Sequence, residues 1–184
     1  METSELRTPA NGKDFAVRDA GPDDLAELVA LSRKTFTDKF GALYPPEDLT
    51  AFLDQYHSEA YYASALADPA NLVRVAATSD GTLSAYLLCS PLSLPADNAR
   101  PGALELKRIY VDAPLQGCGL GSAFVGEAIA WAKARGAPEL YLSVFSENDG
   151  ARKLYKRHGW KKVSEFIFEV GRVQDLEFLM RLDL

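Results

Sequence analysis

The sequence predicts an α/β (α+β) fold in which strands and helices alternate along one continuous chain. Segments with the two-residue alternation of a strand are interspersed with segments whose apolar residues recur at helical spacing. In addition, the run LELKRIYVDAPLQGCGLG reads as a buried strand, a glycine-punctuated loop and the start of a helix. No internal repeat or low-complexity tract interrupts this order.

The elements are bounded by clear start and stop signals. Gly21-Pro22-Asp23-Asp24 is a good helix start because proline suits the first turn and acids favour the helix dipole. Ser79-Asp80-Gly81-Thr82 is typical of a hairpin turn, and Gly136 with Pro138 ends a helix. The expected strands are 15–19, 72–78, 83–90, 104–111, 139–145, 160–169 and 172–182, and the expected helices are 25–40, 46–67, 119–135 and 148–158.

Length and composition fit one compact enzyme domain at 14–184 after a flexible leader at 1–13, because 184 residues with 47% hydrophobic content can bury a sizeable core. The net charge of −6 argues against a nucleic-acid partner. No membrane partner is expected, since no apolar run could cross a bilayer and no signal peptide is evident. Cys89 and Cys118 have neither metal nor redox spacing, which favours a cytoplasmic protein without a metal.

The loop QGCGLG at 116–121 has the composition of an anion site made of main chain. Its three glycines allow a tight turn and the close approach of a ligand. A helix is expected from about Leu120, so unpaired N–H groups and the positive end of the helix dipole would face the loop. No Lys or Arg lies between Asp112 and Ser122, so the backbone would have to hold the anion. A glycine cluster that only makes turns is the structural alternative.

Two better-known phosphate loops do not fit this segment. The G-x-x-x-x-G-K-[ST] type needs a lysine after its last glycine, and none stands in that register. The dinucleotide-binding G-x-G-x-x-G type has a different glycine spacing and needs an acid on the next strand. Here the strand at 139–145 instead starts with its only acid, Glu139.

Gln116 to Gly121 matches the Q/R-x-x-G-x-G/A signature of the GNAT superfamily of N-acetyltransferases, with the expected strand before it. Downstream, ELYLSVFSENDGARKLYKRHGWKKV resembles the second conserved block of that family, with Asn148, Ala151 and Tyr155 at matching positions. The resemblance covers residues 70–183 and, more loosely, the N-terminal helices. It implies a mixed sheet of six to seven strands flanked by four helices, with a splayed parallel pair that binds acetyl-CoA.

The resemblance also implies which residues bind the acyl donor. Ile109 and Val111 would offer backbone hydrogen bonds to the pantetheine arm, and residues 116–122 would hold the pyrophosphate. The implied set is Ile109, Tyr110, Val111, Gln116, Gly117, Cys118, Gly119, Leu120, Gly121, Ser122, Asn148, Ala151 and Tyr155. Asn148 is in addition a suitable helix N-cap, and the two roles are compatible.

Tyr155 is the candidate general acid. It shares one face of its helix with Ala151, Leu154 and His158, so its ring is expected to point inward with a hydroxyl that needs a partner. In the family, the matching tyrosine protonates the thiolate of the departing coenzyme A. A core tyrosine with a satisfied hydroxyl is the alternative.

Glu105 is the candidate general base, because several family members place a strand carboxylate at this interval before the loop glycine. Strand alternation predicts one side with Glu105, Lys107, Ile109 and Val111, and another with Leu104, Leu106, Arg108 and Tyr110. The alternative for Glu105 is an ion pair with Lys107 or Arg108. Many family members use a water chain in place of one dedicated base.

The acceptor is expected to be a small primary amine, acetylated by direct transfer in a ternary complex. The segments 35–40 and 104–111 and the pattern from Phe166 to Met180 resemble the bacterial PaiA-type spermidine/spermine acetyltransferases, which implies a polyamine. Candidate carboxylates for its ammonium groups are Asp38, Glu47, Asp48 and Glu165, each with a solvated surface role as the alternative.

Other functions stay open at this point. A non-catalytic acyl-CoA-binding regulatory module would need the phosphate loop but has no use for Tyr155. A protein N-terminal or lysine acetyltransferase would need a peptide-docking segment, and none is evident. An acyl-cysteine route through Cys118 is disfavoured because this residue lies within the pyrophosphate loop. A homodimer is left open as the assembly.

Overall fold

The computed structural model describes residues 15–184, so the leader predicted at 1–13 lies outside the described residues. Its strands form one seven-stranded sheet in the order β1-β2-β3-β4-β5-β7-β6. Neighbouring strands are antiparallel except β4 and β5, which run parallel. The predicted mixed sheet with a parallel pair is therefore confirmed. None of the helices in the described residues is both long and apolar enough to span a bilayer.

The elements lie close to where the sequence pattern predicts them. The strands are β1 (Phe15–Asp19), β2 (Leu72–Thr78), β3 (Leu83–Pro91), β4 (Leu104–Val111), β5 (Glu139–Phe145), β6 (Lys161–Val170) and β7 (Val173–Asp183). The α-helices are α1 (Leu25–Phe40), α2 (Pro46–Tyr56), α3 (Glu59–Ala67), α4 (Leu120–Ala134) and α5 (Asp149–Arg157).

The segment 46–67, predicted as a single helix, is divided into α2 and α3. His57 leaves the helical conformation with φ −130° and ψ 33°, and the Ser58 hydroxyl accepts a hydrogen bond from the N–H of Tyr61 at 3.2 Å. Serine is a strong N-cap, so the second helix begins at Glu59. The break matters for the site because it turns the His57 side chain into the aromatic cluster with Phe36 and Phe52.

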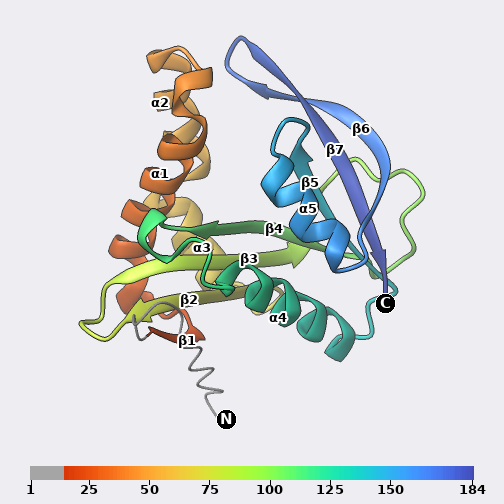
Figure 1. Ribbon diagram of the computed structural model, residues 1–184, viewed down its shortest axis with the longest axis horizontal. Helices are drawn as coiled ribbons and strands as arrows, with labels where there is room; N and C mark the ends of the chain where they lie inside the picture. Colours follow the sequence, from red (N-terminus) through yellow and green to blue (C-terminus); the bar gives the residue numbers. More distant parts are fainter. Residues whose placement is uncertain (1–14) are drawn as a thin grey trace.

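Helices cover both faces of the sheet (Figure 1). On one face, α4 and α5 pack with the central strands in a cluster that includes Phe124, Tyr155 and Trp160. On the other face, α1 and α3 pack on β2 and β3 through Leu28 and Tyr62. The hairpin of β6 and β7 reaches across to α2, where Val170 joins a third cluster. This last contact connects the β6–β7 hairpin to the N-terminal helices.

The parallel strands β4 and β5 pair only at their beginnings and then diverge (Figure 1). Their register consists of Leu104 opposite Leu140 and Glu105 opposite Tyr141. Just after this point β4 has a bulge: Leu106 pairs with Cys89 and Arg108 with Leu88, so Lys107 is the extra residue. The splayed parallel pair that the family resemblance implies is present in the structure.

The bulge changes which side of the sheet each β4 residue faces. Leu104, Leu106, Ile109 and Val111 all pack with the α4 cluster, whereas Arg108 and Tyr110 contact aromatic residues of α3 and β3 on the opposite face. The expectation that Ile109 and Val111 share a side with Glu105 and Lys107, and that Leu104 and Leu106 share one with Arg108 and Tyr110, is wrong. One extra residue reverses the alternation from Lys107 onward.

Candidate active site

A cleft of about 1360 Å³ lies where β4 and β5 diverge. Its walls come from α1, α2, β4, β5, the beginning of α4, α5 and the β6–β7 hairpin. Every residue of the predicted donor-binding and catalytic set lines this cleft except Cys118. Residues from distant parts of the sequence are thus brought together as the family resemblance implies.

The glycine loop presents open main chain to the cleft. Gly117 and Gly119 have φ of +78° and +86°, which L side chains rarely adopt, and a Cβ on either would meet no atom of residues 15–184 within 4 Å. Gly119 is the N-cap of α4 and provides no side-chain cap. The first intrahelical bond runs from the N–H of Ala123 to the carbonyl of Gly119, so the N–H groups of residues 120–122 have no helical partner.

Gly121 does not make the tight turn that was expected of it, whereas its contact with the cofactor stays a prediction. It lies inside the first turn of α4 and has no positive φ, so it makes no tight turn. A Cβ there would approach Cδ2 of Leu154 at 3.4 Å. The glycine therefore lets α5 pack closely against the beginning of α4.

Side-chain hydrogen bonds hold the loop and the beginning of α4 in place. The Gln116 side-chain amide donates to the carbonyl of Val111 at 3.0 Å, and the Cys118 thiol donates to the carbonyl of Leu115 at 2.7 Å. His158 Nδ1 lies 2.9 Å from the carbonyl of Leu154 and must donate to it. In the neutral ring Nε2 then accepts from the Ser122 hydroxyl, 3.2 Å away, which ties α4 to α5.

The edge of β4 that faces the cleft has backbone groups available for a ligand. The N–H of Asp112 bonds the carbonyl of Ser84 on β3 at 2.8 Å. The N–H and C=O groups of successive residues point alternately to the two edges of a strand. Those of Tyr110 therefore also point toward β3, while those of Ile109 and Val111 point toward the cleft. Gln116 already occupies the carbonyl of Val111, so the groups of Ile109 are the more open ones.

Tyr155 is a buried tyrosine whose hydroxyl has no hydrogen-bond partner among the described residues. Its side chain is 8% exposed, and its ring centroid lies 5.9 Å from that of Trp160. Burial raises the pKa of Tyr155 above its ordinary value, and the negative charge of Glu177 adds to this shift. The phenol is consequently a proton donor at neutral pH and is free to bond a ligand in the cleft.

Asn148 caps α5: its side-chain oxygen accepts from the N–H of Ala151 at 3.4 Å. The predicted N-cap role is confirmed. Because Asn148 and Ala151 also line the cleft, a contact with the pantetheine arm is compatible with this geometry and stays a prediction.

Glu105 is buried, at 3% exposure, and both its oxygens have partners. One accepts from the N–H and the hydroxyl of Ser93 at 2.8 Å each, and the other lies 3.5 Å from Nζ of Lys107. Lys107 also donates to the Ser93 hydroxyl at 2.8 Å. The ion pair that was the alternative role for Glu105 is present, although the residue lines the cleft.

Two carboxylates that the sequence analysis did not single out, Asp175 and Glu177 on β7, line the cleft as well. The Tyr44 hydroxyl donates to Asp175 at 2.5 Å. Burial raises the pKa of Glu177, the hydroxyl of Ser143 opposes this shift, and the charge of Asp175 adds to it. The signal was in the sequence: acids at alternate positions of VQDLEFLMRLD mark one side of an otherwise apolar strand.

The acids predicted to bind the acceptor lie mostly elsewhere. Among them only Asp38 lines the cleft, where it pairs with Lys34 at 2.9 Å. The other three form surface ion pairs: Glu47 and Asp48 with Arg172, and Glu165 with Lys162. These three have the surface role that was the alternative.

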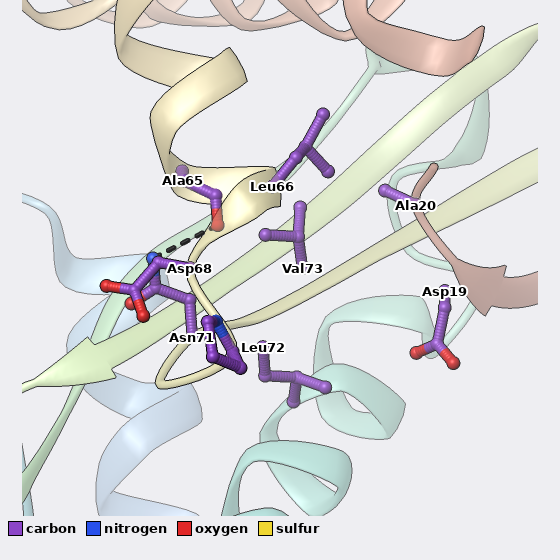
Figure 2. Close-up of a pocket in the computed structure, with 9 residues that line it drawn as sticks. Asp19, Ala20, Ala65, Leu66, Asp68, Asn71, Leu72 and Val73 are labelled. Carbon is purple, nitrogen blue, oxygen red and sulfur yellow. Dashed lines mark hydrogen bonds between the residues drawn. The ribbon is translucent and has the colours of Figure 1, made fainter. Parts of the chain in front are cut away.

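Figure 2 shows another, much smaller hollow of about 180 Å³ beside the end of α3. Its titratable groups are Asp19, which pairs with Arg74 at 2.8 Å, and Asp68, which accepts a bond of its own turn at 2.8 Å. The Asn71 amide donates to the carbonyl of Ala65 at 3.1 Å. These polar groups already have structural partners, so the hollow offers no chemistry comparable with the cleft.

Comparison with known proteins agrees with this geometry. The chain matches the acetyltransferase (GNAT) family over residues 28–160. An uncharacterized N-acetyltransferase of Lactobacillus delbrueckii subsp. lactis is 30% identical over 158 residues, which is 86% of this chain and 91% of that protein. One of Mycobacterium tuberculosis is 26% identical over 161 residues, or 88% and 98% of the two chains.

Among solved structures, the PaiA N-acetyltransferase of Thermoplasma acidophilum in complex with coenzyme A is similar in fold. The TM-score is 0.73 at 19% identity, over 92% of this chain and 99% of that one. Within residues 15–184 no group of three or more His, Cys, Asp or Glu side chains could hold a metal ion. The splayed strands, the open start of α4 and these matches together show that the chain belongs to the acetyltransferase (GNAT) family and is an acetyl-CoA-dependent N-acetyltransferase.

Proposed function

We propose that the protein acetylates a small primary amine by direct attack on acetyl-CoA within a ternary complex. The observation that carries the proposal is the set of chemical groups that line the one large cleft. It is lined by the open N-terminus of α4, by the phenol of Tyr155, which has no hydrogen-bond partner in residues 15–184, and by the carboxylates of Asp175 and Glu177. Groups suited to a diphosphate, a leaving thiolate and an ammonium are therefore found along one continuous surface.

The donor end would bind without a lysine in the loop. The unpaired N–H groups of residues 120–122 and the helix dipole suit the pyrophosphate. The absence of a Cβ at Gly117 and Gly119 leaves room for its oxygens. Ile109 on the free edge of β4, with Asn148 opposite on α5, would bind the pantetheine arm and direct the thioester toward Tyr155.

The transfer itself needs one base and one acid. The ammonium of the acceptor gives a proton to a carboxylate, and the nitrogen lone pair then forms a bond to the thioester carbon. The carbon–sulfur bond breaks as Tyr155 gives its proton to the sulfur, which leaves as the thiol. The acetylated nitrogen still carries two protons at this point. It loses one of them to solvent, and the phenolate of Tyr155 takes up a proton from solvent. The carboxyl group that served as the base also releases its proton to solvent.

We propose Glu177 as the base. Its pKa is raised by burial, which makes the carboxylate a better proton acceptor, and its charge is felt by the phenol of Tyr155. Glu105, the sequence-based candidate, remains the alternative base, but its two oxygens are held by Ser93 and Lys107. The two candidates are distinguished by parallel Glu→Gln substitutions.

The polyamine prediction rests on the sequence resemblance and is retained as one arm of the test. A binding module is disfavoured by Tyr155, whose hydroxyl has no partner among the residues that the structure describes, because such a module has no use for an acid at the sulfur. A protein substrate is an open alternative, to be tested with a peptide.

The experiment measures thiol release from acetyl-CoA with spermidine, spermine, amino acids, amino-acid amides and a lysine peptide. Direct transfer predicts that double-reciprocal plots of the initial rate intersect when the concentrations of both substrates are varied. It also predicts no release of coenzyme A before the acceptor is added. Parallel lines and an acceptor-independent burst would show an acyl-enzyme instead. Tight binding of acetyl-CoA without turnover of any amine would favour the binding module.

A further inference from the structure

Arg108 is a cation in the cleft wall that makes no ion pair with any carboxylate in residues 15–184. It follows the β4 bulge, and Nη1 donates to the carbonyl of Tyr56 and to the hydroxyl of Tyr62, each at 2.8 Å. Its guanidinium carbon lies 4.6 Å from the ring centroid of Tyr61. The Nε and Nη2 atoms of Arg108 have no hydrogen-bond partner in residues 15–184, and both are accessible to solvent.

The carboxylates of the cleft are not available to Arg108, because most already have partners. Lys34 bonds both Asp38 and Asp112, Lys107 and Ser93 hold Glu105, and Tyr44 holds Asp175. The remaining one, Glu177, makes no ion pair with Arg108 in residues 15–184, and its pKa is raised by burial and by the like charge of Asp175.

The groups that do surround Arg108 are neutral. The Tyr62 hydroxyl, having accepted from Arg108, donates to the Tyr86 hydroxyl at 3.0 Å. His57, 1% exposed and a lining residue of the same cleft, is uncharged because burial and then the charge of Arg108 lower its pKa to about 2. Aromatic faces and hydroxyls hold the guanidinium in place without neutralising it. A partly desolvated cation of this kind favours an anion supplied by a ligand.

We propose that Arg108 binds a carboxylate carried by the acceptor, so that the acceptor is an amino acid or a related amino-carboxylate. The free Nε and Nη2 groups form the side of a guanidinium fork that matches a carboxylate with two parallel bonds. Tyr110 lies two residues along β4 on the same face as Arg108, and both line the cleft together with Tyr155 and Glu177. The inference rests on the proposed function, since it places the acceptor's amine at Glu177 and its carboxylate at Arg108.

The test compares acceptors that differ only in charge. Straight-chain amino-carboxylates from glycine to 6-aminohexanoate, common α-amino acids and the carboxamide of each are titrated calorimetrically into protein saturated with coenzyme A. The expected result is that at least one carboxylate binds at least tenfold more tightly than its amide, as for a hydrogen-bonded charge pair. Arg108→Gln should abolish this preference, and Arg108→Lys should retain part of it.

Arg33→Gln is the matched control, because Arg33 lies on α1, pairs with Asp54 at 3.0 Å and is not a lining residue of the cleft. It should leave the carboxylate preference unchanged. Equal binding of carboxylates and amides by the natural protein, or a preference that survives in folded Arg108→Gln, would overturn the inference. Should Arg108→Gln not fold, the natural protein and Arg108→Lys decide the matter. Thiol release with the same panel is scored separately: an Arg108-dependent preference without acetyl transfer would refute the proposed function but not the anion site.

Discussion

Replacing Tyr155 by phenylalanine separates the catalytic role of its hydroxyl from the structural role of its ring. The ring packs against Trp160 in the α4 cluster, and this packing is unchanged in phenylalanine. The hydroxyl has no hydrogen-bond partner in residues 15–184, so its removal breaks no bond, and the free energy of unfolding should change by less than about 1 kcal/mol. For a chain of this size the corresponding shift in Tm is less than about 4 °C.

The effect on turnover should be much larger. Loss of a positioned general acid typically reduces the rate by about 10²–10⁴-fold, which corresponds to about 2.7–5.4 kcal/mol in the activation free energy. The affinity for acetyl-CoA should persist, because the loop and the start of α4 are untouched. Burial raises the pKa of Tyr155 above its ordinary value of 10.0, so the phenol stays protonated at neutral pH and no alkaline loss of kcat below that value should come from this residue.

The assay is thiol release at saturating acetyl-CoA with the best acceptor of the panel, together with calorimetric titration of coenzyme A and a thermal melt. Tyr141→Phe is the matched control: this tyrosine is also buried, but it bonds Glu139 at 3.2 Å and is not a lining residue of the cleft. Its kcat should stay within a few-fold of the natural value. An undiminished kcat in Tyr155→Phe would refute the acid role, and an equal loss in both variants would attribute the effect to packing.

Three further perturbations test the other parts of the site. Glu177→Gln should lower kcat by about 10²–10⁴-fold and remove the acidic limb of the rate profile, since only the ionised form accepts a proton; Glu105→Gln should do so instead if that residue is the base. Because the pKa of Glu177 is raised in the folded state, its ionised form destabilises the fold at neutral pH, so Glu177→Gln should leave Tm at pH 7 equal or higher, with the gain vanishing below the ordinary pKa of 4.5. Gly121→Glu adds a negative charge beside the predicted phosphate site and a Cβ 3.4 Å from Leu154. Calorimetry should show that it weakens coenzyme A binding at least tenfold. Gly126→Glu is the control and should leave this affinity unchanged, because Gly126 is exposed on the same helix and its Cβ would meet no atom of residues 15–184 within 4 Å. Cys118→Ser should keep nearly full turnover, because the thiol bonds the carbonyl of Leu115 and is not a lining residue of the cleft; complete loss in a folded variant would revive an acyl-cysteine route.

Local signals in the sequence predicted most of the fold. The bounds of the strands, of α1, α4 and α5 agree with the pattern within one residue, because periodicity, glycine and proline act over a few positions. The division of α2 from α3 was missed although Ser58 is a good N-cap, since the apolar residues on both sides suggested one continuous helix. The motif residues around the loop were found because the family resemblance fixes them to their neighbours in the chain.

The acceptor side was harder to predict because it depends on pairing between distant strands. Asp175 and Glu177 reach the cleft only because β7 lies beside β5 rather than at the edge of the sheet. Tyr44 approaches Asp175 from a segment more than a hundred positions away. No pattern within either segment specifies this contact, so acids chosen by position near the N-terminal helices were mostly surface residues.

The β4 bulge shows how one residue couples the core to the chemistry. The apolar positions 104, 106, 109 and 111 can face the α4 cluster together only if the strand contains one extra residue between the second and third of them. Without the bulge, Arg108 would point into that apolar cluster, where an unpaired guanidinium would be strongly unfavourable. The same insertion therefore satisfies the core, turns Arg108 and Tyr110 toward the aromatic residues of α3 and β3, and lies where β4 leaves β5 to open the cleft. The break in alternation from LEL to IYV is visible in the sequence, and it is the local signal that could have predicted the bulge.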